Sequence, residues 1–453
     1  MIGIAESNKG VMEETIKKME NQDIQFILAS FSDLNGASRA KLVPASRLES
    51  VCRNGAGFAG FAVGDLGHEP QDPDLLCIPD LRSMTVLPWK KDIAWFAGTL
   101  TEDGTAWPFC SRTILLKVVE RAKKLGYVMK TGIEPEFFLL KQDENGMLKP
   151  HDEFDMEQKP CYQQQALMRN IEFLSTLITN MNELGWGVTQ ADHEDANGQF
   201  EINFDFSDSV TSADRITFFK YMVRSMAEER GLISTFMPKP FSSLTGNGSH
   251  MHLSLWDTDD KRRNVFEDPF DPRGFGLSRT AYHFIGGILY HAKALSALVC
   301  PTVNSYKRLT AMDSASGATW APNIIGYGGN NRTQYIRIPA SGRIEFRAMD
   351  GSANPYLATA AILAAGLDGI EKQLDPGEPS SGNLFRNGGT NTELNRLPST
   401  LKEAIELLEQ DDVLMTSLGN DFMNTFIASK KAEWAQYHSF VSSWEIDKYL
   451  KGY

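Results

Sequence analysis

The sequence has little of what zinc proteins, dithiol redox enzymes and membrane proteins usually show. Its 453 residues include five cysteines, at positions 52, 77, 110, 161 and 300, and no two of them form a CxxC pair. A zinc site or a dithiol centre is therefore not expected, and scattered cysteines suit a reducing compartment. The most apolar long stretch, residues 283–300, contains two histidines and a lysine. It predicts a buried helix and not a membrane span.

An excess of basic residues and the common phosphate-binding loops are also missing. The formal net charge is −13, which argues against a nucleic-acid partner. No GxxxxGK[ST] motif occurs, and the GxGxxG pattern at Gly55, Gly57 and Gly60 lacks the preceding strand and following helix of a dinucleotide site. A dehydrogenase is thus disfavoured. The first residues lack a basic segment followed by an apolar run, so we expect a cytoplasmic protein without a signal peptide.

The pattern of apolar residues predicts an α+β fold with two domains. In the first, residues 1–105, a helix at 11–21 precedes short strands at 24–33, 39–45 and 83–89. A polar, turn-rich segment at 101–110 places the boundary near residue 105. In the second, residues 106–453, helices are expected at 112–125, 162–184, 213–230, 279–299, 400–409 and within 419–440. They do not alternate regularly with strands, which disfavours a doubly wound fold.

Charged residues recur two positions apart on short, strand-like segments of the second domain. They are Glu134 and Glu136, His250 and His252, and Arg343, Glu345 and Arg347; Glu194 and Glu201 stand in HEDANGQFE. Residues i and i+2 of a strand point to one face, so each segment directs its charged side chains to one place. Carboxylates with an imidazole suit Mg²⁺ or Mn²⁺, and arginines suit carboxylate or phosphate groups. The pattern predicts an active site for a metal and a phosphate.

Each of these signals has an ordinary structural explanation when it is taken alone. Glu134 and Glu136 resemble a solvated strand face, although the apolar run 137–140 that follows makes burial of unpaired acids costly. The HxH pair is typical of satisfied core histidines as well as of ligands. The Arg343–Arg347 segment resembles a ladder of surface ion pairs. Their occurrence together is what favours function.

In combination the segments resemble the glutamine synthetase family over nearly the whole chain. The motifs appear in the family's order: GIEPEFF, HEDANGQFE, FMPKP, GNGSHMHLS, NSYKRL, NNRTQYIRIP, GRIEFR and ANPYL. The resemblance implies a β-grasp domain over 1–105 and a catalytic domain over 106–453, with an antiparallel active-site sheet flanked by helices. It also implies an ATP-dependent ligase for L-glutamate, with two or three Mg²⁺ or Mn²⁺ ions. The resemblance further implies a dodecamer of two hexameric rings, in which adjacent subunits share each active site.

The resemblance also implies a role for individual residues. Metal ligands would be Glu136, Glu194 and Glu201 for one ion and Glu134, His250 and Glu345 for the other. Glutamate would meet Gly246, Arg308 and Arg347, and Arg332 would stabilise the transferring phosphate. ATP would contact Phe206, His252, Ser254, Arg337 and Arg343.

Departures from the family pattern bear on the amine substrate. Two acids that help ammonia-using bacterial members to bind ammonium are replaced here by Ala59, in FAGFA, and by Trp320, beside Thr319 in SGATWAP. A less anionic and more apolar pocket suits an alkylamine, since a buried methyl group contributes about 0.8 kcal/mol. Asp65 is a candidate replacement acid, and Thr245 stands where the family often has an asparagine that touches glutamate.

Within the family we therefore expect a ligase that joins glutamate to methylamine. An ammonia-using glutamine synthetase and a γ-glutamyl-polyamine ligase are the alternatives, although we identify no acids that would hold the distal ammonium of a polyamine. A relative that has lost catalysis is disfavoured, because all six metal ligands and the four arginines 308, 332, 337 and 347 are present.

Overall fold

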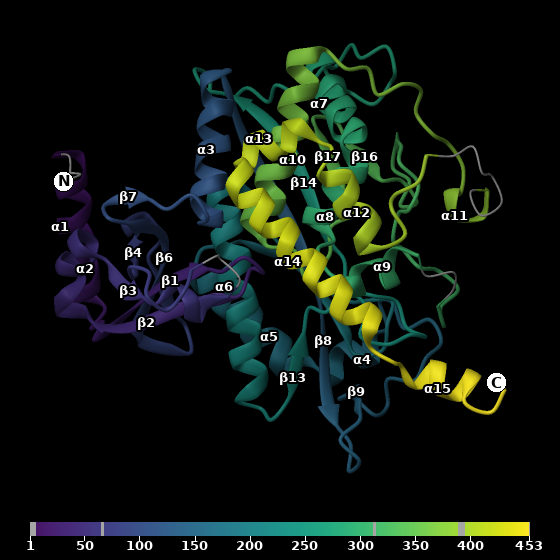
Figure 1. Ribbon diagram of the computed structural model, residues 1–453, viewed down its shortest axis with the longest axis horizontal. Helices are drawn as coiled ribbons and strands as arrows, with labels where there is room; N and C mark the ends of the chain where they lie inside the picture. Colours follow the sequence, from purple (N-terminus) through teal and green to yellow (C-terminus); the bar gives the residue numbers. More distant parts are fainter. Residues whose placement is uncertain (1–5, 65–67, 311–313, 388–394, 453) are drawn as a thin grey trace.

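The computed structural model describes residues 6–64, 68–310, 314–387 and 395–452. These residues form two β-sheets and the helices that cover them. In Figure 1 the first sheet lies at the left of the view, and the second sheet lies behind the helices at the centre and right. Helix α3 (Ser111–Lys124) contacts strands of both sheets and so lies between them.

The first sheet is built from residues 26–106. Its strand order is β2 (Ser38–Pro44), β1 (Phe26–Ser32), β6 (Lys90–Glu102), β4 (Leu75–Pro79) and β3 (Ala56–Phe58), while β5 (Thr85–Leu87) and β7 (Thr105–Ala106) also pair with β6. Helices α1 (Glu6–Asn21) and α2 (Leu48–Asn54) belong to this region, with short 3₁₀ turns η1 (Ala45–Arg47), η2 (Gly60–Val63) and η3 (Leu81–Ser83). The helix and strands expected here are confirmed, and α2 was not expected.

The GxGxxG pattern lies in this region in a context opposite to that of a dinucleotide site. Gly55 ends helix α2 with a φ of +77°, a conformation that glycine adopts readily. The short strand β3 then follows and leads into the 3₁₀ turn η2. A helix therefore precedes the glycines where the Rossmann motif has a strand, which confirms that the pattern is accidental.

The second sheet carries the charged segments. Its order is β10 (Val188–His193), β11 (Gln199–Phe204), β8 (Tyr127–Gln142), β14 (Ser249–Asp257), β17 (Arg343–Phe346), β16 (Ile336–Ala340) and β15 (Tyr327–Gly328), with β9 (Leu148–Pro150), β12 (Ser207–Asp208) and β13 (Ile233–Thr235) pairing with β8. All pairs are antiparallel except β15 with β16. On β8, Ile133 and Phe137 enter the apolar core, while Glu134 and Glu136 belong to the alternate face.

The remaining helices belong to the same part of the chain as this sheet, and the last of them has no buried residue. They are α4 (Gln164–Arg169), α5 (Ile171–Glu183), α6 (Ser209–Glu228), α7 (Arg279–Tyr290), α8 (Ala292–Val299), α9 (Val303–Leu309), α10 (Pro355–Lys372), α11 (Leu384–Asn387), α12 (Leu401–Leu408), α13 (Asp412–Leu418), α14 (Asn420–Ser439) and α15 (Ser443–Tyr449). Among the described residues, no helix is both long and apolar enough to cross a membrane. The α+β class with an antiparallel active-site sheet is confirmed.

The observed helices differ from the expected ones in three places. The helices expected at 162–184 and 279–299 are each interrupted, at Asn170 and at His291. Helix α10 was not expected at all. Its residues 355–369 are buried on every side, so they show no apolar stripe with the helical period. One apolar core connects α10 with residues of the first sheet such as Ala29 and Phe31, and the division after residue 105 stays a prediction.

Candidate active site

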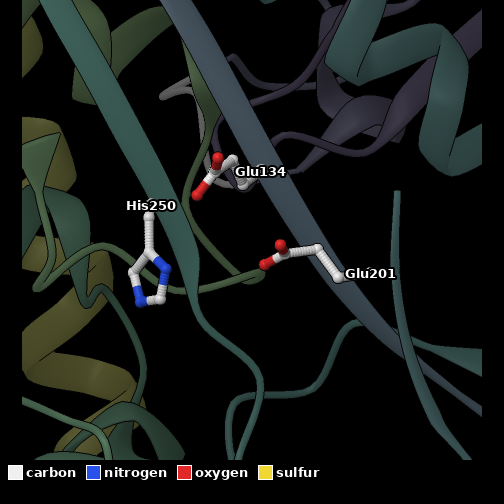
Figure 2. Close-up of side chains that lie close together, drawn as sticks. All are labelled: Glu134, Glu201 and His250. Atoms are coloured by element: carbon white, nitrogen blue, oxygen red, sulfur yellow. The ribbon is translucent and has the colours of Figure 1, made fainter. Parts of the chain in front are cut away.

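The register of the second sheet brings the predicted acids together. Strand β8 lies between β11 and β14, and this places Glu136 opposite Glu201 and Glu134 opposite His250. One atom each of Glu134, Glu201 and His250 lie within 4.8 Å of one another. Figure 2 shows the two carboxylates turned toward the space that the His250 ring borders. This is a donor set for a hard divalent cation.

A second set of donors lies next to the first. Glu134, His252 and Glu345 also bring one atom each within 4.8 Å of one another. His252 pairs with Glu345 across β14 and β17, and its Nε2 atom lies 3.2 Å from Glu134 Oε1. Because Glu134 belongs to both sets, it lies where two neighbouring cations would share a ligand.

Except for Glu345, which is completely buried and does not line it, these side chains face a cavity of about 350 Å³. Of the residues expected at the site, the cavity is lined by Glu134, Glu136, Glu194, Glu201, His250, His252, Trp320, Arg332, Arg337, Arg343 and Arg347. The structure therefore gathers four acids, two histidines and four arginines from segments more than 200 residues apart in the chain.

Burial of like charges perturbs the acids strongly. Burial raises the pKa of Glu194 to about 8, and the nearby Glu136 and Asp192 add to that rise. Burial and the neighbouring carboxylates also raise the pKa of Glu201 well above its ordinary value, and burial raises that of Glu136. We call Glu134, Glu136, Glu194, Glu201 and His250 the acid cluster. Its carboxylates repel one another until a cation neutralises them.

In two members of the acid cluster, Glu134 and His250, the pKa is lowered and not raised. Burial works to raise the pKa of Glu134 as well, but hydrogen bonding from His252 and the positive charge of Arg347 outweigh it and lower that pKa. Burial and the charges of Arg347 and Arg308 lower the pKa of His250 well below its ordinary value. His250 is thus a neutral imidazole, the form that ligates metals.

Glu345 is held by arginines and is completely buried. Its Oε2 atom accepts from Arg337 Nη1 at 2.7 Å, and its Oε1 atom accepts from Arg347 Nη1 at 2.5 Å. Arg347 is itself 1% exposed. Removal of the Glu345 carboxylate would therefore leave a buried guanidinium without its partner.

Arg308 and Gly246, which were expected to contact glutamate, lie behind the acid cluster together with Gly248. Gly246 is fixed by a hydrogen bond of 3.1 Å from Gln199 Nε2 to its carbonyl oxygen. At Gly248, an added Cβ would lie 2.9 Å from Glu136 Oε1 and 3.0 Å from Arg308 Nη2, so only glycine fits there. Arg308 is 3% exposed and does not line the cavity.

Phe206 and Ser254 lie beside the cavity and do not line it. The Phe206 ring is 56% exposed and stacks on Trp256, with 6.5 Å between ring centroids. Ser254 accepts a hydrogen bond of 2.9 Å from Trp256 Nε1. The Lys130 ammonium lies over the same rings, 3.6 Å from the Trp256 centroid and 5.7 Å from that of Phe206.

The residues expected to form the amine pocket are split. Trp320 lines the cavity, and its backbone has a φ of +54°, a conformation that non-glycine residues rarely adopt. Thr319 precedes it but does not line the cavity. Ala59 is exposed on the first sheet's region and does not line the cavity of its own chain. Asp65 lies outside the described residues.

Several lining residues were missed by the sequence analysis. They are Cys161, Tyr162, Gln190, Asp192, Asp195, Asn203 and Pro339. Cys161 and Tyr162 stand in a polar loop, where nothing in the sequence pattern indicates a site. Asp192 and Asp195, in contrast, lie within two residues of Glu194, and that proximity could have indicated them.

Gln199 was missed too, although it stands inside the quoted HEDANGQFE motif. It is completely buried, and its Nε2 atom lies 3.1 Å from Glu136 Oε2 and 3.0 Å from Asn247 Oδ1. It thereby ties strand β11 to β8 and to the segment that precedes β14. We infer that it orients Glu136.

Comparisons with known proteins place these features in a family. Residues 108–449 match the family described as "Glutamine synthetase, catalytic domain". A glutamine synthetase of Rhizobium leguminosarum bv. phaseoli is 45% identical over 95% of this chain and 97% of its own length. A glutamate–methylamine ligase of Methyloversatilis universalis is also 45% identical, with the same coverage. The structure described as "GmaS/ADP complex-Conformation 1" has a TM-score of 0.91 and 48% identity, covering 96% of this chain and 99% of that one.

Proposed function

The chain belongs to the glutamine synthetase family of ATP-dependent ligases, and we propose that it joins the γ-carboxylate of L-glutamate to methylamine or another small alkylamine. In this reaction ATP phosphorylates the γ-carboxylate, and the amine nitrogen then displaces phosphate to give γ-glutamylmethylamide, ADP and phosphate. The observation that carries the choice of amine is the placement of Trp320 on the wall of the acid-lined cavity.

The acid cluster fits divalent cations. Its carboxylates repel one another, and its histidine is neutral, so the donors match Mg²⁺ or Mn²⁺ in charge and type. From the family resemblance we assign Glu136, Glu194 and Glu201 to one ion and Glu134, His250 and Glu345 to a second. The donor atoms that lie within 4.8 Å of one another are instead those of Glu134, Glu201 and His250 and those of Glu134, His252 and Glu345, so Glu134 is a candidate ligand of both ions. Such ions neutralise the phosphate oxygens of ATP during transfer.

The arginines hold the anionic groups around this centre. We assign Arg332 to the transferring phosphate and Arg337 and Arg343 to the phosphates of ATP, since all three line the cavity. Arg347 and Arg308, both buried, would bind the glutamate carboxylate beside Gly246. Phe206 offers its exposed face to adenine, next to Ser254 and His252.

Trp320 gives the amine pocket an apolar wall. An indole beside the acids excludes water from part of the cavity and offers contact to a methyl group, worth about 0.8 kcal/mol, or roughly fourfold in affinity. The two relatives at 45% identity are named for different amines, glutamine synthetase and glutamate–methylamine ligase, so identity alone does not choose between them.

Ala59 and Thr319 would complete the pocket from a neighbouring subunit and from the backbone before Trp320. Ala59 does not line its own chain's cavity, which accords with a site shared between adjacent subunits of a ring. We therefore propose a homo-oligomer, a dodecamer of two hexamers as in other family members, in the cytoplasm.

The test is phosphate release with ATP, Mg²⁺ and glutamate across ammonia, methylamine, ethylamine and putrescine. We expect kcat/KM to be higher for methylamine than for ammonia when each is expressed per free amine. A clear preference for ammonia would reassign the protein as a glutamine synthetase, and a preference for putrescine would favour the polyamine ligase.

Two variants at position 320 test whether Trp320 causes the preference for methylamine over ammonia. Trp320→Phe retains an aromatic wall and should preserve the order of amines. Trp320→Ala removes it and should bring the methylamine-to-ammonia ratio down by roughly the fourfold expected of one buried methyl group. An unchanged ratio in Trp320→Ala would show that the wall does not select the amine.

A further inference from the structure

Asp195 connects three segments that are far apart in the sequence. It follows Glu194 in the turn between β10 and β11, and its side chain is buried. Its Oδ2 atom accepts a hydrogen bond of 2.6 Å from Thr245 Oγ1 and another from Ser316 Oγ. These donors lie 50 and 121 residues along the chain. Asp195 also lines the cavity, together with Trp320.

The segment that contains Ser316 leads directly to Trp320. We call residues 314–320 the flap segment. It is folded on itself by hydrogen bonds between the Ser314 hydroxyl and the backbone of Ala318, and it is attached to its surroundings by the N–H of Ala315, which donates to the Ser243 carbonyl at 2.8 Å. Beyond Ala318, the chain reaches the cavity at Trp320.

A carboxylate suits this arrangement better than any neutral group. Each hydroxyl has one proton to donate, and those of Thr245 and Ser316 both point to the same oxygen of Asp195. Hydrogen bonds to an ionised acceptor are about twice as strong as neutral ones. An asparagine would retain one acceptor oxygen but would lose the charge that strengthens both bonds.

The backbone of Trp320 explains why such an attachment is needed. Its φ of +54° is unfavourable for a residue with a Cβ, so the conformation persists only where surrounding contacts impose it. The indole is 36% exposed and thus not held by burial alone. The attachment at Asp195 lies four residues before it through Ser316.

We propose that Asp195 is a positioning residue that fixes the flap segment and holds Trp320 over the cavity, where it sets amine affinity and excludes water. The effect of Asp195 on amine affinity rests on the proposed function. Its attachment of the flap segment does not depend on that function. Asp195 acts through Ser316 and Trp320 and touches no reacting atom in this assignment.

Ser316→Ala is the first variant, because it removes the bond to Asp195, together with the hydroxyl's contacts to Ser314 and Ala318, and leaves Asp195 beside Glu194 unchanged. We expect the KM for methylamine to rise about tenfold with little change in kcat, the size of one lost hydrogen bond to a charged group. Hydrolysis of ATP without amine should rise severalfold, because water reaches the γ-glutamyl phosphate more easily. Ser243→Ala is the matched control: its side chain is exposed, and only its backbone carbonyl serves the flap segment.

Epistasis with Asp195 tests the connection. Asp195→Asn should show the same change of amine KM, and adding Ser316→Ala to it should raise KM by less than the product of the two single effects. Full multiplication of the two effects would mean that the two residues act separately, which would overturn the proposal.

Quenching of Trp320 fluorescence by acrylamide gives a readout that needs no turnover. The Trp320 contribution is obtained by difference from Trp320→Phe, and we expect it to be quenched more readily in Ser316→Ala than in the wild type or in Ser243→Ala. Circular dichroism checks that the variants are folded. A folded Ser316→Ala protein with unchanged quenching overturns the positioning role. If the wild type ligates no amine, the proposed function fails, and the quenching result alone then decides the role of Asp195.

Discussion

Two sets of charged side chains that are buried in this molecule differ in how their charges are balanced. One is the acid cluster at the cavity, and the other surrounds Arg112, between the two sheets. Arg112 donates to both oxygens of Asp214 at 2.9 Å and to Asp80 at 2.8 Å, and Tyr356 donates to Asp214 at 2.7 Å. We call these four residues the Arg112 cluster. Every charge in it has a partner of opposite sign or a hydrogen-bond donor.

The acid cluster has no such balance. Burial and the neighbouring carboxylates raise the pKa of Glu194 to about 8 and that of Glu201 well above its ordinary value. In the Arg112 cluster, burial by itself lowers the pKa of Arg112, but the charge of Asp214 outweighs it and raises that pKa. This difference distinguishes a structural cluster from a ligand site. In a structural cluster the side chains neutralise one another's charges, whereas a ligand site keeps a charge that a bound ligand neutralises.

The largest expected effect follows from removing one charge of the acid cluster. Glu201→Gln keeps the hydrogen bond that Glu201 Oε1 accepts from Asn203 but deletes one negative charge. We expect turnover to fall by at least about a thousandfold, roughly 4 kcal/mol of transition-state stabilisation. In EDTA, the melting temperature should rise, because repulsion within the cluster is relieved.

Steady-state phosphate release and thermal unfolding in EDTA measure these two changes. Glu49→Gln is the control, since Glu49 is an exposed residue of α2 that pairs with Arg53. It should shift stability by less than about 0.5 kcal/mol. Wild-type turnover in Glu201→Gln, or a lower melting temperature in EDTA, would contradict the reading of the cluster as a metal site.

The same acid-to-amide change in the Arg112 cluster should lower the stability of the protein, whereas in the acid cluster it should raise stability in the absence of metal. Asp214→Asn leaves the guanidinium of Arg112, only 4% exposed, with Asp80 as its one carboxylate. We expect the free energy of unfolding to fall by about 3 kcal/mol. Denaturant unfolding measures it, and kcat of the folded fraction should stay near the wild-type value. A stability equal to the wild type would remove the distinction between the two clusters.

Divalent cations should stabilise one cluster and not the other. At a concentration a hundred times its Kd, Mg²⁺ should raise the free energy of unfolding by about 2.7 kcal/mol. Asp214→Asn should retain that increment, and Glu201→Gln should lose most of it. Thermal unfolding with and without Mg²⁺, with Ca²⁺-free buffers and equal ionic strength, measures the increment. Equal increments in both variants would place the cation elsewhere.

The sequence indicated the members of the acid cluster because the signal is local. Glu134 and Glu136 share a face through strand periodicity, and Glu194 and Glu201 stand in one motif. Their mutual contact depends on the register of β8 with β11 and β14, which spacing along the chain does not encode. The order of family motifs supplied the connection that periodicity does not provide.

The Arg112 cluster and the attachment of Asp195 had no such local signal. Arg112 and Asp214 are 102 residues apart, and each stands on an ordinary helix. Asp195 and Ser316 are 121 residues apart. Helix α10, which brings Tyr356 to Asp214, is apolar on all sides and shows no period. Pairs of this kind become visible only when the chain is folded.

A third buried cluster surrounds His291. Its charges also neutralise one another, but only while His291 is protonated, so its contribution to stability should depend on pH. His291 Nδ1 lies 2.6 Å from Asp411 Oδ2, and its Nε2 lies 3.1 Å from Asp368 Oδ2. Lys372 also pairs with Asp368, at 2.9 Å. Both ring nitrogens therefore face carboxylates, which requires both to carry protons. The site lies where α7 ends and α8 begins, against α10 and α13.

The sign of the pH effect follows from the direction of the shift. Burial by itself lowers the pKa of His291, but the hydrogen bonds and charges of Asp411 and Asp368 outweigh it and raise the pKa above 6.5. The folded protein then keeps a proton that the unfolded chain has lost, so the stabilisation is complete below pH 6.5 and declines as the pH rises through the raised pKa. His291→Gln should cost about 1–2 kcal/mol at pH 6 and less at pH 9. Denaturant unfolding of both proteins across that range measures the difference, and a difference that stays constant with pH would mean that His291 is neutral in the fold.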